Sequence, residues 1–399
     1  MGGSDRLCIT SPWCIYVLTL LYAVGASGSL PPDPDNAALL YYQAVLARPE
    51  PDLATYASLL MVTFGADPNE RIRRYMRDSR DAIRFTDAAT RVPLCNWGIL
   101  YSQGDSLRTM LGRLEQLVLL LEVDAWIFAA DGDYRSGLDR ALSIRRFAGH
   151  LADETIFGYG VSLRTHETAL AYIQNTLGNA ASDRDTLLWL DAQISEVQGP
   201  PKTPGKQVES TLEQTLQAVR AHPDAISTWR RHVAYAVTDE ATKGKLLSLT
   251  DEDALERAKE SCDRFVPSVQ VVIASERPYD QKRAELERLV DELQDMGSEG
   301  NPIWLAFVGV SVKGLIVTQY DIYMRCLARY NAVRAAIELC IERMKTGQFP
   351  PILPAYLPKD PFSGQDFEYQ VADAGFILRC RGKDISEDKI WEYEFKVGK

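Results

Sequence analysis

Apolar residues recur at helical spacing over much of this 399-residue chain. From Leu107 to Leu121 they stand three or four positions apart, which is the pattern of a helix with one core-facing side. Asp131-Gly132-Asp133 then forms a short polar turn, and the helical pattern resumes at Tyr134. A connection this short makes successive helices antiparallel, so we expect a helical hairpin here.

Prolines and capping residues separate the other helical segments. Three prolines between residues 31 and 34 mark a linker, and Asp35 or Asn36 is expected to cap the helix that follows. Asp52 caps the next helix, and Pro68 stands in the first turn of a third, where its missing N–H costs nothing. The helices expected in the first half of the chain are 37–47, 53–64, 67–86, 106–130, 134–148, 153–178 and 183–198.

Three prolines and two glycines at 199–205 make the clearest internal break, because this composition excludes both helix and strand. Beyond it, apolar stripes at 208–219 and 286–296 indicate further helices, and a long final helix is expected from Pro302 to Lys345. The body therefore divides into an N-terminal helical region, a Pro/Gly linker and a C-terminal helical region, at 29–198, 199–206 and 207–348.

The apolar period changes to two in the last region, 349–399. Apolar and polar residues alternate over 367–371 and over 376–380, with Gly375 at the reversal, and this pattern predicts a β-hairpin. A third alternating run at 391–397 predicts one more strand. We predict a mainly α fold, an array of antiparallel helical hairpins with a small C-terminal antiparallel three-stranded β-sheet, which packs on the last helix because such a sheet is marginal alone.

The first 28 residues have the layout of a signal peptide or a membrane anchor. Leu7 to Ala26 carries no charge, and the small residues Ser27 and Gly28 follow it. A run of 20 uncharged residues is also long enough to cross a bilayer. We expect an exported protein of the periplasm or cell envelope, either cleaved or anchored by residues 7–26, and no membrane-spanning segment after them.

Two resemblances add to this pattern. The hairpin around Gly132 resembles one unit of a tetratricopeptide-type repeat. The helix from Ala332, the Asp360-Pro-Phe-Ser-Gly364 turn and Gly375-Phe376 resemble the C-terminal part of type II secretion pseudopilins, and the ending of uncharacterised exported proteins of planctomycete bacteria. The second resemblance implies a helix followed by a hairpin, and association with a secretion or pilus-like apparatus.

The charge balance and the cysteines exclude several classes of function. Net charge is -11 and no basic stripe is present, so we expect no nucleic-acid partner. The five cysteines after the leader form neither a disulfide framework nor a zinc-type CxxC pair. A disulfide between Cys340 and Cys380 is left open. The charged runs Arg71 to Arg74 and Arg145-Arg146 are interpreted as solvated helix faces.

One cluster of residues has the composition of a metal site. Imidazole and carboxylate groups together can bind a divalent cation and activate water, and five such residues lie close in sequence: His150, Asp153, Glu154, His166 and Glu167. Their spacing matches no known zinc motif, and the bland interpretation is that they are helix-end and surface groups. No nucleophile elbow or glycine-rich phosphate loop is present, so we predict no cofactor.

These observations favour a non-enzymatic function. We expect an exported or membrane-anchored helical scaffold that offers a surface to another envelope protein and touches the membrane only through its N-terminal segment. The alternatives are a metal-assisted hydrolase that uses the cluster from His150 to Glu167, and a component of a secretion or pilus-like apparatus.

Overall fold

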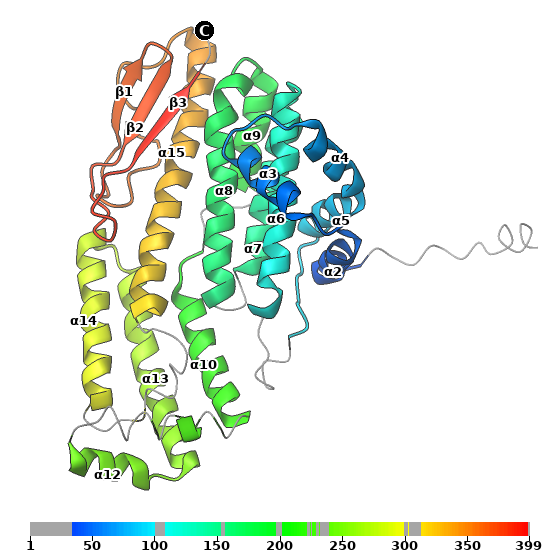
Figure 1. Cartoon of the computed structure of the whole chain (residues 1–399). Helices are drawn as coiled ribbons and strands as arrows, with labels where there is room; N and C mark the ends of the chain where they lie inside the picture. The colour runs from blue at the N-terminus through cyan, green and yellow to red at the C-terminus, as the bar shows by residue number, and fades with distance from the viewer. Residues whose placement is uncertain are drawn as a thin grey trace, which may run out of the picture. The chain divides into compact units, whose positions relative to one another are not determined.

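The computed structural model describes residues 34–99, 108–152, 156–196, 202–221, 224, 226–228, 231, 239–298, 302 and 313–397 (Figure 1). The predicted leader, 1–28, lies outside these residues. The predicted fold class is confirmed, because helices make up most of the chain and one three-stranded antiparallel sheet lies at the C-terminal end.

Four short helices begin the described chain: α2 (Ala37–Ala47), α3 (Leu53–Thr63), α4 (Glu70–Asp78) and α5 (Arg80–Thr90). The predicted caps are present. Asn36 accepts a hydrogen bond from Ala38 N at 3.2 Å, and Asp52 accepts one from Thr55 N at 2.7 Å. These side chains satisfy N–H groups that a helix start leaves without a partner.

The single helix predicted over 67–86 is wrong, because the chain breaks at Ser79, which ends α4 and precedes α5. The break lets the two halves pack on different neighbours. Helix α4 contacts α3 and α6, while α5 contacts α2, α6 and α7. A straight helix could not reach both sets, so tertiary packing overrides the local pattern here.

Four longer helices follow: α6 (Arg108–Ala130), α7 (Tyr134–Leu151), α8 (Ile156–Ala180) and α9 (Arg184–Glu196). The predicted turn between α6 and α7 is confirmed. Gly132 adopts a left-handed φ of 82°, which glycine reaches without strain, and Asp133 accepts a hydrogen bond from Ser136 N at 3.1 Å. Helix α7 then packs along both α6 and α8.

The second half contains α10 (Gly205–Ala221), α12 (Glu240–Ser248), α13 (Asp251–Ala274) and α14 (Tyr279–Ser298). The helices predicted from the stripes at 208–219 and 286–296 are confirmed as α10 and α14. Helix α13 packs between them and contains Pro267. Residues on both sides of the predicted linker, Leu190 and Val208, belong to one hydrophobic cluster.

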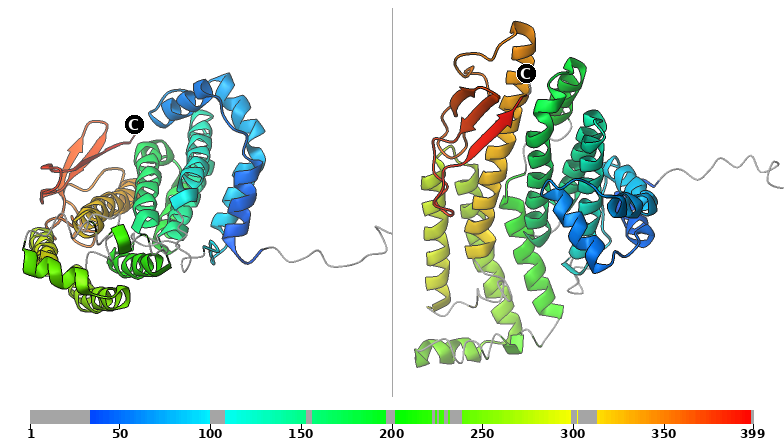
Figure 2. Two further views of the ribbon diagram at one scale, coloured as in Figure 1. Left: turned by 60° about the horizontal axis from the view of Figure 1, so that its bottom comes forward. Right: turned by 45° about the horizontal axis from the view of Figure 1, so that its top comes forward.

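The last long helix, α15 (Gln319–Thr346), is preceded by a π-helical turn, η3 (Gly314–Thr318). The prediction of one regular helix from Pro302 is therefore corrected at 314–318, where the hydrogen bonding widens. Helix α15 contacts α8 and α9, and the views in Figures 1 and 2 agree that α8 and α15 lie side by side. It ends at Gly347, whose φ is 84°.

The sheet has the order β1 (Glu368–Ala372), β2 (Gly375–Arg379), β3 (Glu392–Lys396), with antiparallel neighbours. Tyr393 and Phe395 of β3 are buried, while the alternate residues are exposed, as the period of two predicts. The sheet was expected to pack on the last helix, and the contacts of β3 include that helix but extend beyond it. Strand β3 packs chiefly on α8 and also on α15.

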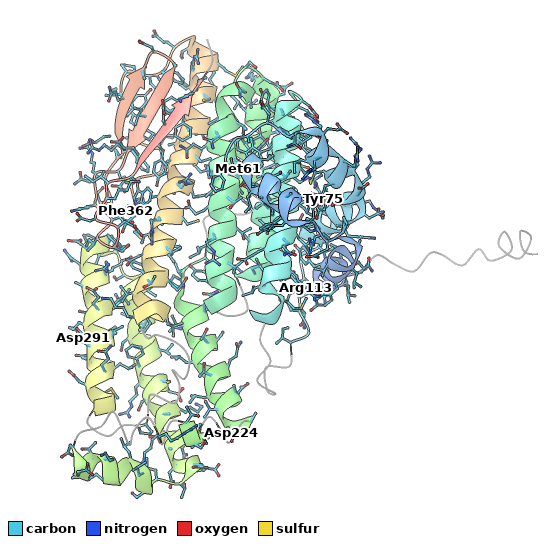
Figure 3. All side chains as sticks on the ribbon, viewed as in Figure 1. Met61, Tyr75, Arg113, Asp224, Asp291 and Phe362 are labelled. Atoms are coloured by element: carbon cyan, nitrogen blue, oxygen red, sulfur yellow. The ribbon has the colours of Figure 1, made fainter. Side chains whose placement is uncertain are left out.

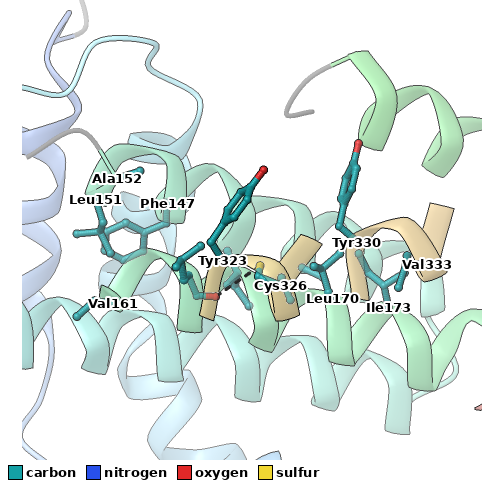
Figure 4. Packing of buried hydrophobic residues seen from close by; sticks show 14 of the residues in the cluster. Phe147, Leu151, Ala152, Val161, Leu170, Ile173, Tyr323, Cys326, Tyr330 and Val333 are labelled. Atoms are coloured by element: carbon teal, nitrogen blue, oxygen red, sulfur yellow. Dashed lines mark hydrogen bonds between the residues drawn. The ribbon is translucent and has the colours of Figure 1, made fainter. Parts of the chain in front are cut away.

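The core is dominated by one cluster that extends from α2 to the sheet. Figure 4 shows part of it, a row of apolar side chains from α7, α8 and α15 that includes Phe147, Leu170, Ile173 and Tyr323. A smaller cluster joins α10, α12 and α13 through Val219, Ile226, Leu246, Ala254, Leu255 and Ala258.

Candidate functional site

His150, the first residue of the predicted metal cluster, lies at the C-terminal end of α7. Its Nδ1 is 2.9 Å from the hydroxyl of Tyr41 on α2. Its carbonyl oxygen accepts a hydrogen bond from the indole of Trp97 at 3.3 Å. Through these contacts His150 holds α2 and the segment after α5 against α7, which is a structural role.

His166 lies in the interior on α8, with 6% of its surface exposed. Burial lowers the pKa of His166 to about 3, and the positive charge of Arg145 lowers it in the same direction. The imidazole is therefore neutral near pH 7. A neighbouring guanidinium also repels a metal cation, so the surroundings of His166 do not favour the predicted metal.

Glu167, the next residue on α8, pairs with Arg329 of α15 at 2.9 Å. Burial raises the pKa of Glu167, and the positive charges of Arg329 and Arg325 oppose that rise. The thiol of Cys326 on α15 donates a hydrogen bond to the backbone carbonyl of Leu163 on α8 at 3.9 Å. The pair links α8 to α15 in the middle of the helical array.

The structure therefore directs the described members of the cluster toward different partners. Asp153 and Glu154 lie outside the described residues. Within the described ranges, no group of three His, Cys, Asp or Glu side chains is arranged so that it could hold a metal ion. The complete five-residue site stays a prediction.

The interpretation of Arg145-Arg146 as a solvated helix face is wrong for Arg145, because only 1% of the surface of Arg145 is exposed. Its guanidinium lies 5.0 Å from the centroid of the Tyr330 ring on α15, a cation–π distance, and the Tyr330 hydroxyl also bonds it. A planar, weakly hydrated guanidinium suits such a site. Arg145, His166 and Glu167 thus form part of a polar layer between α7, α8 and α15.

Cys340 and Cys380, the pair left open for a disulfide, are both buried free thiols. Burial raises the pKa of Cys340 to about 12. A thiol in this environment is not a nucleophile at neutral pH, because the thiolate is the reactive species. These cysteines pack as small apolar side chains.

The grooves on the surface of the described residues include two that lie between helices of different pairs. One, of about 440 Å³, runs between α10 and α13 and has an apolar floor that includes Leu212, Leu216 and Val266. The other, of about 430 Å³, lies between α4, α5 and the α6–α7 pair. Five arginines and two aspartates border it: Arg73, Arg77, Arg80, Arg84, Arg140, Asp87 and Asp124.

The arginine-lined groove is partly neutralised by its own ion pairs. Arg140 contacts Asp87 and Asp124 at 2.9 Å each. Arg73 binds Asp131 through two hydrogen bonds of 2.7 and 3.0 Å. These pairs tie α4 and α5 to the α6–α7 hairpin, so the groove is first of all a contact between helices.

The most unusual surface belongs to α2 and α3. Neither helix contains a charged residue, yet both expose large apolar side chains: Leu46 is 85% exposed, Leu53 84% and Phe64 82%. We define the apolar face by its exposed residues: Leu39, Leu46, Leu53, Tyr56, Leu60, Met61 and Phe64. Met61 marks its position on α3 in Figure 3.

Sequence reasoning identified α2 and α3 as helices but did not identify this face. The missing charges were visible over 37–47 and 53–66. The sequence did not show that these helices expose apolar side chains, because a helix that is apolar all round is normally buried. Exposed apolar side chains gathered in this way are typical of surfaces that contact another molecule.

None of the helices among the described residues combines the length and the hydrophobicity that a membrane span requires. Residues 7–26, for which a span was considered, lie outside that part of the chain.

Comparison with known proteins gives no match. No family model, no curated protein and no solved structure is significantly similar to this chain. The resemblances to tetratricopeptide repeats and to pseudopilins therefore stay predictions.

The burial of His166 predicts a pH-dependent stability. The unfolded chain takes up a proton near pH 6.5, whereas the folded chain does so only near pH 3. Between these values the unfolded state binds more protons, so the free energy of unfolding falls as pH falls. His166→Gln should remove about 2 to 3 kcal/mol of the loss between pH 6.5 and pH 4.5.

Urea unfolding of both proteins at several pH values measures this difference. The quantity to compare is the slope of stability against pH, since the substitution can also change stability at every pH. Parallel curves for wild type and His166→Gln between pH 4.5 and pH 6.5 would contradict the buried, neutral imidazole.

Proposed function

We propose that this protein is a non-catalytic helical scaffold of the cell envelope, exported by its N-terminal segment and docked through the apolar face of α2 and α3. Its role is to hold the long helices and the C-terminal sheet at a fixed place. No reaction is assigned to it, and the histidines act in the packing of the helices.

The exposure of the apolar face is the observation that supports this proposal. Leaving a large aliphatic or aromatic side chain in water costs about 1.5 to 3 kcal/mol relative to burying it. Leu46, Leu53 and Phe64 are each more than four-fifths exposed. A soluble chain gains nothing from such residues in water, so a docking partner that covers them accounts for their presence.

The ionisable groups between the helices support the scaffold part of the proposal. Arg329 pairs with Glu167 between α15 and α8, and Arg283 of α14 pairs with the buried Asp321 of α15 at 3.2 Å. Removing one partner of a buried pair is strongly destabilising. These groups hold neighbouring helices in register, as a rigid spacer requires.

Accessibility of the apolar face in the envelope tests the proposal. Phe64→Cys places a thiol on the face, and Ile352→Cys places one at a 78% exposed apolar position after α15. We expect a membrane-impermeant maleimide to label Phe64→Cys at least about tenfold more slowly in envelope preparations than in the isolated full chain, since thiol reactivity follows access. Ile352→Cys should react equally in both, and the unsubstituted chain gives the background.

Equal labelling of Phe64→Cys in the two preparations would show that nothing covers the face, and the docking role would be abandoned. Stoichiometric bound metal, or hydrolysis of an ester or phosphate that is lost in His166→Ala, would instead support the hydrolase alternative.

A further inference from the structure

We propose that the surface covering the apolar face is a lipid bilayer, with the apolar side chains among the acyl chains and arginines of α4 and α5 at the lipid phosphates. This inference rests on the proposed docking role and names its partner. It adds a second membrane contact to the N-terminal segment.

The first reason is that the apolar face offers almost no hydrogen-bonding group to a partner. The hydroxyl of Ser58 donates to the carbonyl of Ala54 at 2.8 Å, and that of Thr63 donates to the carbonyl of Leu60 at 2.8 Å. The hydroxyls of Ser58 and Thr63 are therefore used by the backbone of α3, and Tyr56 carries the one hydroxyl among the residues that define the face. Protein interfaces carry about one hydrogen bond per 100 to 200 Å², whereas the acyl region of a bilayer requires none.

The second reason is the charge that follows the face along the chain. Six arginines fall between residues 71 and 84, against Asp78 and Asp81, in a chain whose net charge is -11. Arg71, Arg74 and Arg80 are exposed, and none of them forms an ion pair with another described residue. Arg71 and Arg74 lie on α4, which packs on α3, and Arg80 begins α5, which packs on α2, so these cations lie on the helices next to those of the apolar face.

Apolar residues beside arginines are the composition of a surface that lies in the membrane interface. The apolar part enters the boundary between head groups and acyl chains, and each arginine near an anionic surface strengthens the attraction. Tyr56 adds an aromatic ring with a polar tip, which suits the same depth.

The third reason is the distance along the chain to the uncharged N-terminal run. Only residues 27–36 separate Ala26 from the start of α2 at Ala37. Ten residues span at most about 35 Å. If residues 7–26 stay in the bilayer as an anchor, the apolar face cannot leave its neighbourhood, and the local lipid concentration at the face is high.

Site-specific photo-crosslinking tests the inference on the full chain. A benzophenone amino acid replaces Phe64 in one variant and Ile352 in the other, and each protein is mixed with vesicles of three parts phosphatidylcholine and one part phosphatidylglycerol. We expect adducts of lipid mass at position 64 and none above background at position 352. Because each adduct is mapped to its residue, insertion of the N-terminal segment cannot imitate the result.

The crosslinked product also separates the two proposals. A protein-sized adduct at position 64 in envelope preparations, or a dimer of the chain, would keep the docking role and overturn the lipid inference. Absence of any lipid adduct at position 64 with vesicles would overturn it as well. Protection from maleimide is the separate readout for the docking role itself.

Substitution of the arginines is a second test of the lipid inference. Arg71→Gln, Arg74→Gln and Arg80→Gln together should raise the lipid concentration that gives half of the maximal adduct by about ten- to a hundredfold, because each basic residue near an anionic surface contributes a factor of roughly five. With pure phosphatidylcholine vesicles the triple variant and the parent should behave alike. Equal adduct formation by both on the anionic vesicles would remove the arginines from the inference.

Discussion

Gly178→Ala is expected to detach the C-terminal sheet from α8. A Cβ on Gly178 would overlap the carbonyl oxygen of Lys396 and approach the backbone of Val397. Neither group can rotate away as a side chain would, so β3 or α8 must shift. Overpacking of this kind costs about 3 kcal/mol or more, well above the roughly 1 kcal/mol that alanine gains over glycine inside a helix.

The loss should appear as a lower midpoint of urea unfolding and as faster proteolysis within residues 368–397. Gly149→Ala in α7 and Gly112→Ala in α6 are matched controls, because no heavy atom lies within 4 Å of a Cβ built at either position. Each control should be stabilised by about 1 kcal/mol. If Gly178→Ala were as stable as Gly149→Ala, the contact between β3 and α8 described here would be wrong.

The strands themselves were predictable, while their cover was not. Alternation over 391–397 assigns one face of β3 to the core, because side chains in a strand point alternately to opposite sides. This alternation does not indicate which helix packs against that face of β3. Gly178 inside a helical pattern was no sufficient signal, because Gly112 and Gly149 also lie inside helices and no heavy atom comes within 4 Å of a Cβ built there.

Part of the buried polar layer of Arg145, His166 and Glu167 was also predictable from the sequence. Arg145 follows Leu138 and Leu142 at intervals of four and three, and His166 stands between Leu163 and Leu170 at intervals of three and four. Both residues therefore occupy core-facing positions of α7 and α8. Their residue types instead predict a surface position, because charged and imidazole side chains usually lie there. That prediction was preferred to the one from helical spacing, and it is wrong for both residues.

The break at Ser79 had no comparable signal. Residues 70–86 include neither proline nor glycine, and the apolar positions continue at helical spacing. The split depends on which helices α4 and α5 contact, and those partners are distant in sequence. The exposure of the apolar face was equally unpredictable from the sequence, because only the complete arrangement of helices decides which side of α3 is in contact with solvent.

Asp360→Asn is the second substitution from which we expect a large loss of stability. The Asp360 carboxylate is fully buried and accepts hydrogen bonds from Phe362 N at 3.0 Å, Ser363 Oγ at 2.6 Å, Arg381 N at 2.9 Å and Gly382 N at 2.8 Å. Three of these four bonds go to Oδ2. One side chain thus joins the turn after Pro361 to the chain that leaves β2.

An amide group in place of Oδ2 would face those donors with hydrogen atoms of its own. Buried donors without acceptors cost about 1 to 3 kcal/mol each, so we expect Asp360→Asn to lose about 4 kcal/mol, allowing for relaxation of the turn. Asp360→Ala should lose a similar amount, because it removes every acceptor as well. Urea unfolding measures the loss, with the exposed Asp366→Asn as the matched control that should stay near wild type. Asp360→Asn and Asp366→Asn of equal stability would mean that this carboxylate does not hold the turn against the sheet.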